Sequence, residues 1–275
     1  MTTIIDIREL HYSYGPAVAL DGIDLVVEEH EWVAVVGANG SGKSTLARIL
    51  GGLERPGRAA EAVVCGCDLL THQGRMAARV QAGVLFQDPE SQFVGASVEE
   101  DLAFGPENLG WQPQRIAARV AELAGEFDLR ELLERAPQTL SGGQKQRTAL
   151  AGVLAVPRRL IVLDEPTSML DPAGRDEVLQ AVRRLHGTGL AVVFVTQEMD
   201  EVAAATRVVA LRAGRVAFDG PPAALFGQAR LVDELSLGLP PAAEVAHELA
   251  RRGHGLASLP LSIDALAAAL LGRRR

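Results

Sequence analysis

The chain has 275 residues, of which 48% are hydrophobic, 23% charged and only 4% aromatic. A chain of this length and balance buries a sizeable, mainly aliphatic core, in one large domain with an attachment or in two domains. Asp and Glu total 35 against 27 for Lys and Arg, and the formal net charge of -8 argues against a broad surface for nucleic acid or anionic lipid. The sequence has no apolar run of about 18 residues and no basic start before an apolar stretch, so we expect neither a membrane span nor a signal peptide.

The first 50 residues predict a β layer and then a buried strand that leads into a helix. Residues 4–10 and 20–27 alternate as half-buried strands do, with turn residues between them. Residues 32–36 are continuously apolar and are followed by glycines, which indicates a central strand that enters a loop. A helix is expected over residues 43–50. Further along, Cys65 and Cys67 are expected to be reduced strand residues, because a disulfide between them would be strained.

A helix-rich segment, about residues 97–155, interrupts this strand and helix alternation. Apolar residues at steps of three and four predict an amphipathic helix over 112–127. The alternation resumes with strands expected at 160–163 and 190–196, and residues 207–218 are expected to form a hairpin. We therefore predict an α/β fold with an N-terminal antiparallel β layer, an inserted helical subdomain and a small C-terminal helical appendage. The expected boundaries are a domain over 1–225 and a helical extension over 226–275.

Residues 37–45 read GANGSGKST and match the pattern G-x-x-x-x-G-K-[ST] between the predicted strand and helix. Glycines let backbone amides surround phosphate oxygens, and the start of the helix directs its positive end at them. Lys43 adds a charge for the β and γ phosphates, and Ser44 places a hydroxyl where Mg²⁺ would bridge them. The loop predicts a nucleoside triphosphate site made by Gly37, Ala38, Asn39, Gly40, Ser41, Gly42, Lys43, Ser44 and Thr45.

Two adjacent carboxylates follow the apolar strand at residues 160–163. We predict that Asp164 faces the metal, while Glu165 polarises a water in line with the γ phosphate. Taken alone, the pair is equally typical of a solvated acidic turn. The phosphate loop upstream favours the catalytic interpretation.

Residues 140–147 read LSGGQKQR at the start of another predicted helix. With the phosphate loop, the DEP strand end and the SMLD of residues 168–171, the chain resembles an ATP-binding cassette (ABC) ATPase over nearly its whole length. The resemblance implies a RecA-like P-loop NTPase core in which two cassettes sandwich two ATP molecules. It also implies that the partner's ATP is faced by Ser141, Gly142, Gly143 and Gln144. Asp171 would lie at the subunit contact, and it is also a plausible helix cap, since the two roles can coexist.

Three further positions follow from this resemblance. Tyr14 takes the place of the aromatic residue that stacks on adenine, although Tyr12 is close and an ordinary strand role is about as plausible for either. Gln87 matches the glutamine that meets the metal and the attacking water, so that the implied Mg²⁺ set is Ser44, Gln87 and Asp164. Gln197 stands where the family usually has histidine. It keeps an amide donor but cannot become cationic, and we expect a competent site that is slower on the order of tenfold to a hundredfold.

The segment 86–110 and the C-terminal tail resemble ATPase subunits of energy-coupling-factor transporters, including the cobalt-import type. The resemblance implies a peripheral protein on the cytoplasmic face of the membrane that powers uptake of a vitamin or a transition-metal ion. The implied partners are a second ABC ATPase subunit, identical or related, an integral membrane coupling subunit and a substrate-binding membrane subunit. No nucleic-acid partner is expected.

We expect the membrane partner to dock at Phe93, Glu99, Glu100 and Asp101. These acids begin a predicted helix capped near Ser97 and lie beside apolar residues, and an acidic rim around an apolar groove suits an amphipathic helix that carries arginines. A solvated helix start is the alternative. The tail is expected to mediate dimerisation, and a passive helical cap is nearly as plausible.

Two other functions remain open at this point. One is the ATPase of another ABC importer class. The other, less favoured, is a non-transport ABC ATPase acting on nucleic acid, which a single cassette with net acidity does not suit.

Overall fold

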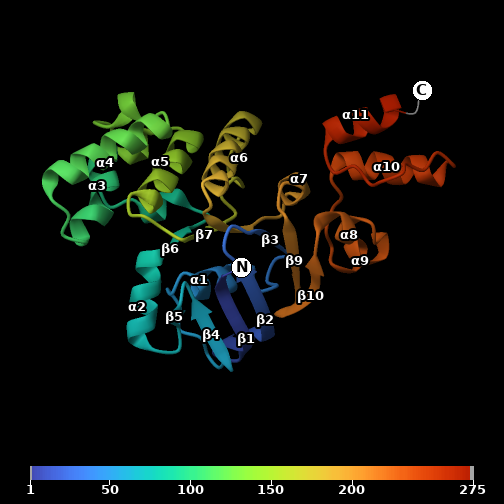
Figure 1. Cartoon of the computed structure of the whole chain (residues 1–275), viewed down its shortest axis with the longest axis horizontal. Coiled ribbons are helices and arrows are strands. Elements are labelled where there is room, and N and C mark those ends of the chain that lie inside the picture. The colour runs from blue at the N-terminus through green and yellow to red at the C-terminus, as the bar shows by residue number, and fades with distance from the viewer. Residues whose placement is uncertain (1, 273–275) are drawn as a thin grey trace.

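Two β-sheets and a set of helices make up the structure, a computed structural model that describes residues 2–272 (Figure 1). The N-terminal sheet is antiparallel, in the order β2-β1-β4-β5. Its strands are β1 (Thr3–Tyr14), β2 (Ala17–Glu28), β4 (Glu61–Val64) and β5 (Cys67–Asp68). Cys67 lies in β5, but Cys65 lies in the turn before it with a φ of 51°, so the expectation of a strand position is wrong for Cys65. Both thiols are free.

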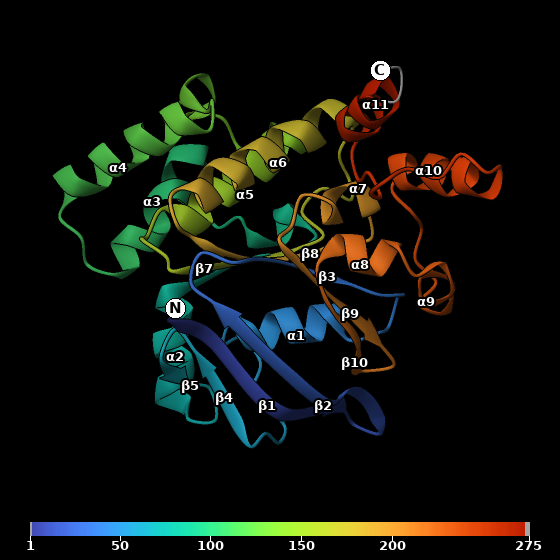
Figure 2. The same ribbon diagram turned by 45° about the vertical axis from the view of Figure 1, so that its right-hand side comes forward.

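The central sheet has the order β10-β9-β3-β8-β7-β6, and only β10 runs antiparallel to its neighbour. Its strands are β3 (Trp32–Val36), β6 (Ala82–Leu85), β7 (Leu160–Asp164), β8 (Ala191–Val195), β9 (Arg207–Arg212) and β10 (Arg215–Gly220). Every residue of β3, β7 and β8 is buried, because both faces of a parallel sheet are covered. Helix α1 (Lys43–Leu50) lies between the two sheets and is the next element after β3 in the chain (Figure 2).

The helical segment lies between β6 and β7 in the chain. It contains α3 (Val98–Asn108), α4 (Pro113–Glu126) and α5 (Gly142–Leu154), which lie at the upper left of Figure 1. Ser97 caps α3, and Pro113 begins α4 at a position where its missing N–H costs nothing. Apolar residues of these helices form one hydrophobic core with one face of the central sheet and with α6 (Pro172–Gly187). Helix α2 (His72–Gln81) packs against β5 and β6 instead.

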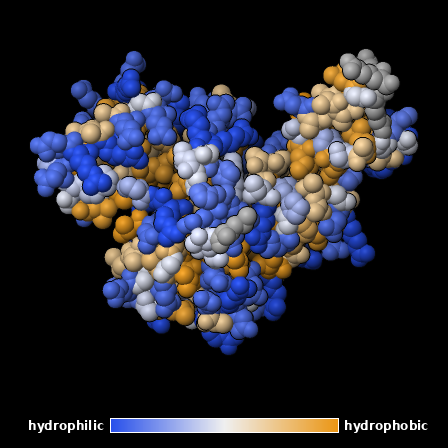
Figure 3. Space-filling view, in the orientation of Figure 1, coloured by the Kyte–Doolittle hydropathy of each residue, from blue (hydrophilic) through white to orange (hydrophobic). Residues whose placement is uncertain are grey.

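Short helices follow the central sheet at its β10 edge. They are α8 (Pro222–Phe226), α9 (Ala229–Glu234), α10 (Pro241–Arg251) and α11 (Ile263–Leu271). Apolar side chains are exposed on α10 and α11, among them Val245, Ile263 and Leu271, and Figure 3 shows orange and tan atoms over this region. None of the helices between residues 2 and 272 has the length and apolar character needed to cross a bilayer. The predicted α/β class with its antiparallel layer, helical insertion and C-terminal helices is confirmed, whereas the boundary at residue 225 stays a prediction.

Candidate active site

The loop between β3 and α1 folds as a cradle because three of its glycines have positive φ angles. Gly42 has a φ of 105°, and a Cβ atom there would lie 2.5 Å from the carbonyl oxygen of Ala19. At Gly37, an added Cβ would lie 2.3 Å from the carbonyl oxygen of Leu211. Only glycine fits these two positions, so the β1–β2 hairpin and β9 hold the loop closely from both sides.

Two buried polar side chains, Lys43 and Ser41, lie inside the cradle. The buried Lys43 ammonium donates to the carbonyl oxygens of Gly37 at 2.7 Å and Ala38 at 3.1 Å. Burial lowers the pKa of Lys43, and the carboxylates of Glu165 and Asp164 oppose that shift. Ser41 Oγ is also buried and makes no hydrogen bond within residues 2–272. A cationic nitrogen and a free hydroxyl beside a helix start fit a bound phosphate group.

Ser44 and Asp164 meet at the side of the cradle that faces β7. Ser44 Oγ donates to Asp164 Oδ1 at 3.2 Å. Burial raises the pKa of Asp164, and the hydrogen bond from Ser44 lowers it in part. A hydroxyl beside a buried carboxylate is a set of hard oxygen ligands, which is the chemistry that Mg²⁺ prefers. The residues present therefore fit this metal.

Glu165 directly follows β7 and has a φ of 49°, which is strained for a residue with a side chain. Both of its carboxylate oxygens accept from amides: Oε2 from Gln87 Nε2 at 3.0 Å and Oε1 from Gln197 Nε2 at 2.6 Å. Gln197 Nε2 also donates to Asn39 Oδ1 in the cradle at 2.9 Å. The structure thus brings four predicted site residues from four segments into one hydrogen-bonded network.

A single cleft of about 600 Å³ joins this network to the phosphate loop and to the tip of the β1–β2 hairpin. Tyr14 lines the cleft and is 45% exposed. Tyr12 is committed elsewhere, because its hydroxyl donates to Glu54 at 3.1 Å and burial and that bond raise its pKa to about 12. Of the two tyrosines, Tyr14 is therefore the one available for a base, although its role remains a prediction.

The signature residues lie outside this cleft. Ser141 caps α5 in a reciprocal arrangement with Gln144, and with Gly142 and Gly143 they line a separate cleft of about 490 Å³. Asp171 lines the same cleft, and its Oδ1 accepts from the Gly174 amide at 2.8 Å, so the helix-capping role is present. Within one chain the signature and the phosphate cradle do not meet.

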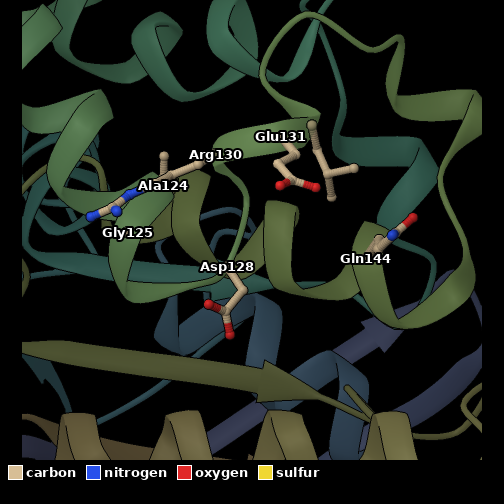
Figure 4. A pocket seen from close by; sticks show the side chains of 7 residues that line it. Ala124, Gly125, Asp128, Arg130, Glu131 and Gln144 are labelled. Carbon is tan, nitrogen blue, oxygen red and sulfur yellow. The ribbon is translucent and has the colours of Figure 1, made fainter.

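Gln144 also lines a pocket of about 430 Å³ within the helical segment, shown in Figure 4. Its walls include the carboxylates of Asp128 and Glu131 together with Arg130. The glycine loop, the start of α1 and the buried Lys43 line the other cleft, so the cleft at the cradle is the better nucleotide site.

The expected docking residues occupy the start of α3. Asp101 Oδ1 accepts from the amides of Val94 and Gly95, and Glu100 accepts from the Ala96 amide. Two of the three acids, Glu100 and Asp101, thus hold the preceding loop. Glu99 and Glu100 are exposed, and Asp101 is half-buried. Phe93 is half-buried against the core, and the neighbouring Val98 and Leu102 are fully buried rather than lining a groove, because α3 turns that face inward.

One buried carboxylate beside the site was missed by sequence reasoning. Glu201 lies in α7 (Met199–Val202) and is 1% exposed. Its position in an acidic stretch, E-M-D-E, gives no sign that it is the one turned inward.

The chain is similar in sequence to known proteins over most of its length. Residues 20–168 match the ABC transporter family. The energy-coupling factor transporter ATP-binding protein EcfA1 of Symbiobacterium thermophilum is 49% identical over 253 residues, which span 92% of this chain and 88% of that relative.

Two solved structures are similar in fold. The cbiO1 protein of Clostridium perfringens, described as part of the ABC transporter complex cbiONQ, superposes with a TM-score of 0.77 at 30% identity, over 91% of this chain and 100% of that one. The ATP-binding cassette MJ0796, solved as a dimer in a post-hydrolysis state with ADP and Pi, gives a TM-score of 0.72 at 25% identity, over 79% of this chain and 98% of that one. The chain therefore belongs to the ABC transporter family, among the ATP-binding proteins of energy-coupling-factor transporters.

Proposed function

We propose that this chain binds Mg·ATP in the cleft beside the cradle and hydrolyses it to drive the import of a small solute through a membrane partner. The observation that carries the proposal is the placement of Glu165. Its carboxylate lies at the cleft that holds the phosphate loop and is fixed by Gln87 and Gln197. A carboxylate so fixed is suited to accept a proton from a water beside the γ phosphate.

The residues of the site have three roles in this proposal: they bind the nucleotide, hold the metal and accept the proton. The cradle amides and Lys43 bind the phosphates, and Tyr14 offers its exposed ring to the base. Ser44 and Asp164, with Gln87, would hold Mg²⁺, which when bound neutralises phosphate charge. Glu165 acts as general base, a role worth about 10²- to 10⁴-fold, and Gln197 orients it.

A second ATPase subunit completes the site in this proposal. The signature and the cradle of one chain line different clefts, so the signature can serve only a nucleotide held by another subunit. The dimeric relative with ADP and Pi supports this arrangement. ATP then stabilises the dimer, and hydrolysis weakens it.

The membrane partners are proposed from the relatives. The cbiO1 protein is described as part of an ABC transporter complex, and EcfA1 proteins are named for energy-coupling factor transporters. We infer a peripheral protein on the cytoplasmic face that joins a coupling subunit and a substrate-binding subunit for a vitamin or a transition-metal ion. The exposed apolar faces of α10 and α11 suit a dimer contact.

The test uses the complex that copurifies with a tagged full-length chain from membranes. Glu165→Gln keeps the size of the side chain, so Mg·ATP binding should persist while phosphate release falls about 10²- to 10⁴-fold. Glu234→Gln, at an exposed ion pair on α9, is the matched control with the wild-type rate. An unchanged rate in the first variant, or no integral membrane protein in the purified complex, would contradict the proposal.

A further inference from the structure

Glu201 is a wholly buried acidic side chain that the proposed chemistry does not use. Its side chain has 0% exposure, in a short helix directly after β8. A carboxylate is seldom removed from water unless partners compensate it. Its partners therefore indicate why it lies there.

Each oxygen of the Glu201 carboxylate accepts from a different segment. Thr167 Oγ1 donates to Oε1 at 2.6 Å, and Thr196 Oγ1 donates to Oε2 at 2.5 Å. Both threonines are buried. Thr196 Oγ1 also accepts from the Glu198 amide at 3.0 Å, which leaves its own proton for Glu201.

A cation faces the same carboxylate from a third segment. Arg175 Nε lies 3.7 Å from Glu201 Oε1, and the guanidinium also donates to Glu198 at 3.0 Å. Burial raises the pKa of Glu201, while the two hydroxyl donors and Arg175 lower it. The partners thus offset part of the cost of burying the charge.

Each of these three partners lies in a segment that also carries a predicted site residue. Thr167 is two residues after Glu165, and Thr196 directly precedes Gln197. Arg175 lies in the first turn of α6, the helix that Asp171 caps. One carboxylate therefore links the segment of the general base, the segment of the orienting glutamine and the helix that starts at the expected subunit contact.

We propose that Glu201 is a positioning residue that fixes the segments after β7 and β8 relative to each other, so that Glu165 and Gln197 meet the γ phosphate together. Only a carboxylate accepts from both threonines at once, since an amide would turn a donor toward one of them. This inference rests on the proposed ATP hydrolysis. It predicts that Glu201 affects the rate of the chemical step and not the binding of ATP, because the phosphate cradle is on other segments.

The first experiment compares Glu201→Gln with Glu198→Gln in the purified complex. Glu198 is the matched control, because its exposed carboxylate contacts the same Arg175 but neither threonine. We expect Glu201→Gln to lower kcat about 10- to 100-fold, with KM for ATP and the thermal midpoint close to wild type. Glu198→Gln should keep the wild-type kcat. A kcat within twofold of wild type for Glu201→Gln, or a KM that rises in the same proportion as kcat falls, would overturn the inference.

A double-mutant cycle with Gln197→Ala separates positioning from a general structural effect. If Glu201 acts through Gln197, its substitution should lower kcat less than threefold in the Gln197→Ala background. If the double variant loses kcat by the product of the two single-variant losses, the two residues act independently and the inference is contradicted.

If Glu201→Gln does not fold, the same role can be tested with Thr167→Val and Thr167→Ser, because Thr167 donates one of the two hydroxyl hydrogen bonds to Glu201. The valine variant should lose kcat and the serine variant, which keeps the hydroxyl, should retain it; equal rates would refute the role. Absence of hydrolysis in the wild type and in Glu198→Gln would instead contradict the proposed function itself.

Discussion

The side-chain amide of Gln197 lies between two segments of the site, donating to Glu165 Oε1 at 2.6 Å and to Asn39 Oδ1 at 2.9 Å. A neutral amide holds the carboxylate of Glu165, the proposed general base, in place but brings no positive charge toward the phosphate loop. Gln197→His would add a ring that can become cationic, and hydrogen bonds to charged groups are about twice as strong as neutral ones. We expect the ATPase rate of the assembled complex to rise on the order of tenfold.

Gln197→Ala is the companion variant, because it removes both amide contacts without adding a charge. Its rate should fall below that of the wild type. A histidine variant that is no faster than the wild type would show that Gln197 does not limit turnover.

Asp164→Asn should stabilise the nucleotide-free protein. Burial raises the pKa of Asp164, so ionising this carboxyl is less favourable in the folded chain than in the unfolded chain, and an uncharged side chain avoids that cost. An asparagine oxygen still accepts from Ser44 and carries no charge. We expect the thermal midpoint without nucleotide to rise by about 2 °C or more at neutral pH, as measured by calorimetry.

The same variant should lose the stabilisation that Mg·ATP gives the wild type, since a ligand that binds only the folded state raises its stability. The comparison uses ATP with Mg²⁺ and ATP with a chelator. A lower midpoint without nucleotide, or an unchanged shift with Mg·ATP, would contradict the assignment of Asp164.

The phosphate side of the site was predictable because it depends on neighbours in the chain. The loop of residues 37–45 lies between a wholly apolar strand and a helix, and both elements have the predicted bounds. The contacts of Glu165 are different. Gln87 and Gln197 are 78 and 32 residues away from it, and no local pattern predicts that both amides reach the same carboxylate.

Residue types also did not reveal which side chains of α3 and of the segment after β8 are buried. The apolar residues of α3 were expected around a docking groove. Val98 and Leu102 pack into the core instead, whereas Phe104 is exposed. Among the acids after β8, Glu201 is buried and Glu198 is half-exposed, and the partners of Glu201, such as Thr167 and Arg175, lie far away in the chain. Periodicity is uninformative over four residues.

Glu99→Lys should weaken the contact with the membrane partner and leave ATP binding intact. Glu99 is exposed in the first turn of α3, whereas Asp101 and Glu100 hold the loop before it through backbone amides. A reversed charge at Glu99 therefore changes the surface alone. We expect less membrane subunit to copurify with the tagged chain, and an effect that diminishes at high salt.

Asp101→Asn is the contrasting variant, because it weakens acceptance from Val94 and Gly95 and should lower thermal stability as well. Loss of nucleotide binding in Glu99→Lys would refute the docking role. Full recovery of the membrane subunit would do so too.

Gly143→Asp should abolish hydrolysis while leaving the fold and the chain's own ATP site intact. Gly142 and Gly143 have negative φ angles, and added Cβ atoms would lie 3.5 Å and 3.6 Å from their nearest neighbours, which is ordinary contact. The chain's own packing therefore does not require glycine there, in contrast to Gly42. An acid at a helix start is also favourable for the helix dipole.

For Gly143→Asp we expect an unchanged thermal midpoint and unchanged binding of a fluorescent ATP analogue to the isolated chain. ATP-dependent dimerisation should fail, because in the proposed dimer the new carboxylate would face the γ phosphate held by the partner subunit. Gly143→Ala, which adds no charge, should retain most of the rate; if the aspartate variant still dimerises with ATP, the signature does not face that phosphate.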